Sequence, residues 1–176
     1  MNEIVKKNGV TYGVISGLIS VLILTLIYST DVNLFISRWI TTLKVTVFIG
    51  LAILLILNTK KQLNGVLDFK DTFKTYFIFA CISLLISTLF EMLLFNFIDP
   101  GLKDTLKELS IKMIVKFLEN FNTPADKINE AVKNIQDNDQ FSVLQLIKGY
   151  FSYLVMCTVI GLILAAIFKS KSTTKE

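Results

Sequence analysis

The chain has 176 residues, of which 53% are hydrophobic and 18% are charged, and its formal net charge is +4. Ordinary soluble domains carry about a quarter charged residues, and the mean hydropathy of this chain is +0.62. The composition therefore excludes an ordinary soluble protein and indicates an integral membrane protein. The positive charge is small and comes from lysines grouped near apolar stretches, so no nucleic-acid partner is expected.

Four apolar stretches are long enough to cross a bilayer, which takes roughly 20 mostly apolar residues. They cover about residues 9–28, 39–57, 75–98 and 147–168. We therefore expect an all-α integral membrane protein with four transmembrane helices, which together form a single membrane domain over residues 1–176. The lipid bilayer is its first expected partner.

The link between the third and fourth stretches, about residues 101–137, has the pattern of two amphipathic helices. Apolar residues recur there at steps of three and four, which indicates a helix; they are Leu102, Leu106, Leu109, Met113, Phe117 and Phe121. A second helix is expected to start with Thr123 as its N-cap and Pro124 at the first helical position. We expect an amphipathic helical hairpin that caps one end of the bundle.

The link between the second and third stretches mixes Val66, Leu67, Phe69 and Phe73 with lysines and aspartates. This mixture suits a short segment lying in the headgroup layer. It suits equally well a solvated turn that is followed by an early start of the third helix. The sequence leaves both alternatives open.

Nine lysines gather in three segments that fall on one side of a four-helix arrangement. They are Lys6, Lys7, Lys60, Lys61, Lys70, Lys74, Lys169, Lys171 and Lys175. Loops rich in lysine and arginine stay in the cytoplasm. We therefore predict that both termini are cytoplasmic and that the hairpin is extracytoplasmic.

Small residues in the first and fourth stretches predict close packing of helices. Gly9, Gly13 and Gly17 follow one another at four-residue spacing, and Gly161 and Ala165 repeat the pattern. In lipid, helices associate through such small residues because their backbones can approach closely. The glycine face could serve a homo-oligomer, or it could seat another helix of the same chain, and we favour the second interpretation.

Glu91 and Lys44 are charged residues inside apolar stretches. At a rise of 1.5 Å per residue, both lie about 9–10 Å from the same membrane surface, on antiparallel helices. Because ionisable groups inside a membrane usually pair, we predict an intramembrane ion pair between them. Alternatively, Lys44 extends its ammonium group to the interface, and Glu91 is protonated, wetted by an outer vestibule, or part of an ion-translocating site.

Signatures of catalysis are missing from the sequence. It has no histidine, no P-loop and no carboxylate pair at metal spacing within a membrane stretch. Cys81 and Cys157 fall within membrane stretches, where we interpret them as small apolar residues that fill space. We therefore expect no enzyme activity, no cofactor, no metal site and no catalytic residue.

The chain resembles the small four-helix membrane proteins of Bacteroidota that are classified only as a domain of unknown function. The resemblance rests on "NGVTYGVISGLIS", "DFKDTFKTYF" and "FNFIDPGLKD". It implies a multi-pass protein of the bacterial inner membrane and assigns no activity to any residue.

Two functions fit these patterns. The first is a non-enzymatic role as a subunit or modulator of an envelope assembly, with contacts made through the outer helices. The alternative is a small transporter or channel that uses Lys44 and Glu91.

Overall fold

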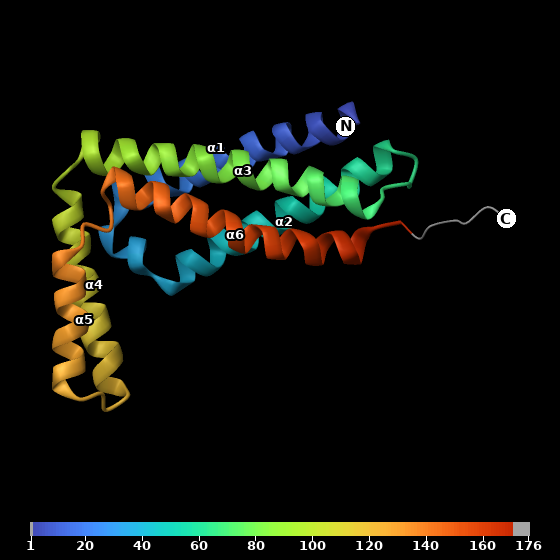
Figure 1. Cartoon of the computed structure of the whole chain (residues 1–176). Coiled ribbons are helices and arrows are strands. Elements are labelled where there is room, and N and C mark those ends of the chain that lie inside the picture. The colour runs from blue at the N-terminus through green and yellow to red at the C-terminus, as the bar shows by residue number, and fades with distance from the viewer. Residues whose placement is uncertain (1, 171–176) are drawn as a thin grey trace.

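The computed structural model describes residues 2–170, and all regular structure in this range is helical. Four long helices run alongside one another, and two shorter helices lie across one end of them (Figure 1). In chain order, the elements are α1 (Glu3–Thr30), η1 (Val32–Ile36), α2 (Arg38–Gln62), α3 (Phe69–Leu93), η2 (Leu94–Ile98), α4 (Leu102–Asn120), α5 (Ala125–Asp137) and α6 (Val143–Phe168).

Within the described residues, four helices are long and apolar enough to cross a membrane: Glu3–Thr30, Arg38–Gln62, Phe69–Ile98 and Val143–Phe168. This confirms the expected helical class with four candidate membrane helices, each longer than the stretch predicted for it. Only 17–28% of the most apolar window of each helix is buried inside the chain. The other apolar side chains of these windows would contact lipid.

We call the end of the bundle that carries α4 and α5 the hairpin end, and the opposite end the terminal end. The first and last parts of the described chain both lie at the terminal end (Figure 1). Of the predicted basic segments, Lys171 and Lys175 lie outside the described residues.

The helices extend past the apolar stretches because polar side chains cap their first turns. The side chain of Asn2 accepts a hydrogen bond from the Ile4 amide at 2.9 Å at the start of α1. Asp68 accepts one from the Asp71 amide at 2.6 Å at the start of α3. Such caps satisfy amide groups that have no partner within the helix, so α1 and α3 each include a polar first turn.

The link between α2 and α3 has a turn at residues 63–65, and α3 begins early, at Phe69, as the second alternative expected. The link is not simply solvated, because Leu67 is 1% exposed and belongs to the core between the helices. The link is also bound to the end of α6: the Leu67 amide donates to Ser170 Oγ at 2.8 Å, and that hydroxyl donates to the Gly65 carbonyl at 2.8 Å.

The apolar interior has two parts. The larger part includes Ala52 and Leu55 of α2 and Phe79 of α3, and the smaller part, at the hairpin end, includes Leu24 and Leu94. The buried residues of α2 all lie in its half toward the terminal end. Toward the hairpin end, α2 therefore departs from α3 and is more exposed.

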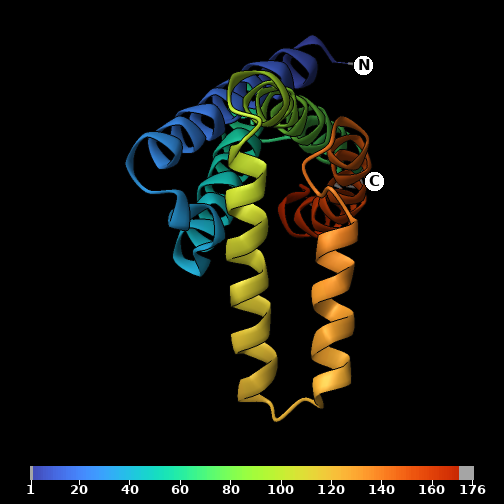
Figure 2. The ribbon, with the colours of Figure 1, turned by 90° about the vertical axis from the view of Figure 1, so that its left-hand side faces the viewer.

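Helices α4 and α5 form an antiparallel hairpin that stands across the bundle and projects beyond it (Figures 1 and 2). The first turns of α4 cover part of the bundle end, where Leu102 and Leu106 join the smaller core. The remainder extends past the bundle, so the expected cap covers the end only in part.

The predicted N-cap of α5 is wrong by one residue, because Pro124 occupies that position without a side-chain cap bond. Thr123 belongs instead to the end of α4, where its amide donates to the Leu118 carbonyl at 3.1 Å. Asn122 has φ +52°, the left-handed conformation that ends a helix in this way.

Candidate functional site at the base of the hairpin

Gly9, Gly13 and Gly17 pack against α3 of the same chain. A Cβ atom on Gly13 would lie 2.9 Å from Ile82 Cβ and 3.0 Å from the Phe79 carbonyl oxygen. A Cβ on Gly9 or Gly17 would meet α3 at similar distances. The structure thus places this face in the chain's own bundle, which is the interpretation that we favoured over a homo-oligomer face.

Gly161 and Ala165 lie where α6 meets α3. A Cβ on Gly161 would come within 2.5 Å of the Tyr76 ring, and Ala165 is fully buried. The small residues of the first and fourth stretches therefore face the two sides of one central helix, α3.

Lys44 and Glu91 do not touch in this structure. Among the described residues, the ion pairs within 4.0 Å are Lys74–Asp71, Lys103–Asp139 and Lys127–Glu130. The divergence of α2 from α3 toward the hairpin end explains the lack of contact, so the ion pair stays a prediction.

A polar cluster lies at the base of the hairpin, and Lys103 is its centre. Lys103 Nζ donates to Asn96 Oδ1 at 2.7 Å and to Asp139 Oδ2 at 3.2 Å. Asn96 in turn donates from Nδ2 to the Phe141 carbonyl at 3.1 Å. One ammonium group thus links η2, the first turn of α4 and the segment between α5 and α6.

Asp99 connects this base to α1. Its Oδ2 accepts a hydrogen bond from the Tyr28 hydroxyl at 3.2 Å, and its Oδ1 accepts one from the Leu102 amide at 3.2 Å. Asp99 directly follows the π-helical turn η2. At the end of this turn, the Asp99 amide donates a hydrogen bond to the Leu94 carbonyl at 2.8 Å. Such turns are frequent at functional sites.

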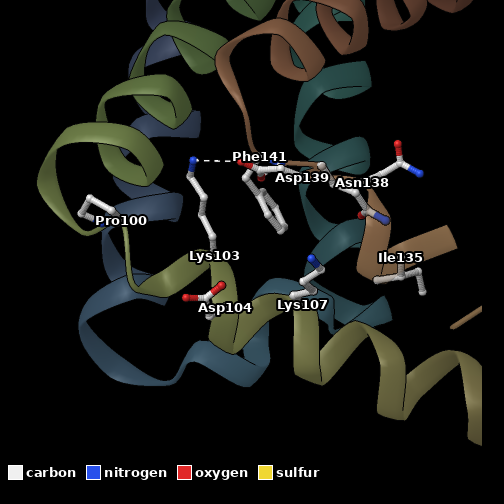
Figure 3. Close-up of a pocket in the computed structure, with 9 residues that line it drawn as sticks. Pro100, Lys103, Asp104, Lys107, Ile135, Asn138, Asp139 and Phe141 are labelled. Atoms are coloured by element: carbon white, nitrogen blue, oxygen red, sulfur yellow. Dashed lines mark hydrogen bonds and ion pairs between the residues drawn. The ribbon is translucent and has the colours of Figure 1, made fainter. Parts of the chain in front are cut away.

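A pocket of about 190 Å³ opens beside this cluster. Figure 3 shows Lys103 extending toward Asp139, with Lys107 and Asp104 on the same helix. Lys107 donates to the backbone carbonyl of Gln136, across the hairpin. Both lysines are therefore already hydrogen-bonded within the chain. Their bonds hold the hairpin in place, and neither lysine is free to bind a ligand in the pocket.

The sequence did not predict this cluster. Lys103 and Asp139 are separated by 36 positions, so only the folded hairpin brings them together. Two features of the sequence could have pointed to it: Asn96 lies within an apolar stretch, and the Asp99-Pro100 pair ends that stretch. In the part of the chain that the structure describes, no group of three His, Cys, Asp or Glu side chains could hold a metal ion.

Residues 11–170 match a family described as proteins of unknown function, DUF4199, and the chain belongs to this family. The match confirms a domain of unknown function over nearly the whole chain, whereas the Bacteroidota source stays a prediction. No curated protein and no solved structure matches the chain.

Proposed function

We propose that this member of the DUF4199 family is a non-enzymatic, multi-pass inner-membrane protein that acts by association, as a subunit or modulator of an envelope assembly. The carrying observation is a helical hairpin that projects beyond the bundle (Figure 2) and is bound at its base by Lys103. A projecting element fixed in this way presents one defined surface to a partner.

The outward face of α5 is the partner surface in this proposal. Ile128, Val132 and Ile135 are half-buried along one face of α5. Asp126, Glu130 and Asp137 are exposed and, by helical periodicity, lie on the opposite face together with Lys133. Glu130 is also paired with Lys127 at 2.9 Å. The carboxylates still outnumber the lysine on this face, and such an acidic face favours a partner with a basic surface, because complementary charges speed association and select partners.

The orientation is part of the proposal. The exposed lysines Lys6, Lys7 and Lys61 lie at the terminal end, and lysine-rich ends stay in the cytoplasm. The hairpin would then be extracytoplasmic. A topology reporter inserted at Asn122 should report the outside and one at Gly65 the cytoplasm, and a cytoplasmic report at Asn122 would overturn this orientation.

The transporter alternative gains no support from the buried polar groups. Asn8 donates to Thr59 Oγ1 at 3.1 Å, and Ser83 donates to Ser16 Oγ at 2.8 Å. These groups bind helices to each other, and such hydrogen bonds carry helix association in lipid. We therefore retain association as the function.

The partner can be captured with a photo-crosslinking residue at Lys133, which is exposed on α5, in membranes of the native host. The control carries the same residue at Val159, an exposed apolar position of α6. We expect a discrete crosslinked protein from position 133 only, and its yield should fall when Asp126 and Glu130 are changed to lysine. If position 133 gives no crosslinked protein, the association proposal fails.

A further inference from the structure

The face of α4 that packs on the bundle continues toward the tip of the hairpin with only partial cover from the chain. Leu102 and Leu106 are buried in the smaller core, and Met113 and Phe117 follow on the same helical face but are 46% and 41% exposed. Side chains three and four residues apart lie on one face of a helix. Met113 and Phe117 therefore point to the same side as the buried leucines, which is the side of the four long helices.

This exposed face is separate from the face that holds the hairpin together. Helix α4 contacts α5, and Ile111, Ile114 and Leu118 on a second face of α4 are half-buried. Met113 and Phe117 therefore lie outside the face of α4 that packs against α5.

The start of α2 indicates the depth, relative to the membrane surface, at which this face of α4 would lie. Arg38 is the first residue of a candidate membrane helix, and its Cζ atom lies 5.8 Å from the centroid of the Phe117 ring. The next residue, Trp39, is 84% exposed. Tryptophan side chains are enriched at the interface between lipid and water, so Phe117 lies at the level where α2 would enter the bilayer.

The direction of α4 agrees with this level. In Figures 1 and 2 the hairpin runs across the four long helices. If these helices cross a bilayer, α4 lies parallel to its surface. By helical periodicity the exposed Lys116 borders the apolar face, whereas Lys112 lies further round the helix, on the same side as Glu108 and Glu119. A lysine beside an apolar face is typical of helices at anionic lipid surfaces.

We propose that α4 is an interfacial anchor that binds the lipid leaflet at the hairpin end of the bundle. Met113, Phe117 and Phe121 enter the boundary between headgroups and acyl chains, and Lys116 binds a lipid phosphate. The rings of Phe117 and Phe121 are paired, with centroids 4.9 Å apart. The anchor needs no protein partner, and it leaves the acidic face of α5 free.

Tryptophan fluorescence of the full-length protein in vesicles tests this anchor. Trp39 is the only tryptophan, so Trp39→Phe provides a silent background for Phe117→Trp and for the control Glu119→Trp. The vesicles contain phosphatidylethanolamine, phosphatidylglycerol and a phosphatidylcholine brominated on its acyl chains, which quenches tryptophan that contacts lipid. We expect Phe117→Trp to lose most of its emission to brominated lipid and Glu119→Trp to lose it only to aqueous iodide.

Two outcomes would overturn the anchor. If iodide quenches both variants equally, α4 stands in water. If neither brominated lipid nor iodide quenches Phe117→Trp, the face is covered by protein, which in this purified preparation is a second copy of the chain. Neither result bears on the crosslinking at position 133, so the anchor and the association proposal fail or succeed separately.

Discussion

The hydroxyl of Ser83 on α3 donates a hydrogen bond to the hydroxyl of Ser16 on α1 over 2.8 Å, in the buried contact between the two helices. Gly13 and Gly17 stand on either side of Ser16 and allow α3 to approach this closely. Small residues and a polar pair thus act together, since lipid offers little hydrophobic gain for joining helices.

The first prediction concerns this hydrogen bond. Ser83→Ala and Ser16→Ala should each lower the free energy of unfolding in detergent by about 0.6 kcal/mol, the average for such bonds in membranes. The double variant should lose less than the sum, because either change alone breaks the bond. Unfolding titrations monitored by circular dichroism would measure this, and strictly additive losses would show that the bond contributes nothing.

The second prediction concerns the close contact of backbones. Gly13→Ala should destabilise the bundle by about 1–3 kcal/mol, because the new Cβ would press on Ile82 and on the Phe79 carbonyl and force the helices apart. Gly50→Ala is the matched control, since nothing lies within 4 Å of a Cβ at that position of α2. Thermal unfolding in detergent should separate the two variants. Equal melting temperatures would contradict the close contact.

Hydropathy located the centres of the four long helices but not their ends. Predicted starts at residues 9 and 75 became Glu3 and Phe69, because capping side chains and polar first turns look like loops to a hydropathy count. The fourth helix also starts earlier than predicted, at Val143. The glycine spacing indicated close packing and favoured a partner helix in the same chain, although it did not identify α3. That choice depends on which helix carries the complementary surface.

The cluster around Lys103 was beyond sequence reasoning for a different reason. Asn96 and Lys103 are seven positions apart, and they meet only because η2 and the Asp99-Pro100 stop turn the chain between them. The divergence of α2 from α3 is likewise a property of the packed bundle. Counting residues along each helix gives the depth of Lys44 and Glu91 in the membrane, but it does not show how far apart the two helices lie.

The third prediction concerns the base of the hairpin. Lys103→Met should loosen α4 and α5, because Asn96 and Asp139 lose the ammonium group that joins them. Amide hydrogen exchange in α5 should become faster while exchange in α1 and α3 stays unchanged. The control is Lys112→Met, which removes an exposed lysine from the same helix. Exchange in α5 that is equally fast in both variants would show that Lys103 does not hold the hairpin.

The last prediction concerns Lys44 and Glu91. Because no ion pair within 4.0 Å joins Lys44 and Glu91 among the described residues, their coupling should be weak, about 0.5 kcal/mol, at the low end of the range for interacting residues. A contacting buried pair would behave differently, since removing one partner alone typically costs about 3–5 kcal/mol.

A double-mutant cycle with Lys44→Met and Glu91→Gln, measured by unfolding in detergent, gives the coupling directly. These replacements keep the length of each side chain and remove its charge, so helix packing changes little. A coupling of several kcal/mol would mean that α2 closes on α3 in the membrane and that the predicted ion pair forms. Strict additivity would mean that the two charges act independently, with the Lys44 ammonium group solvated at the interface.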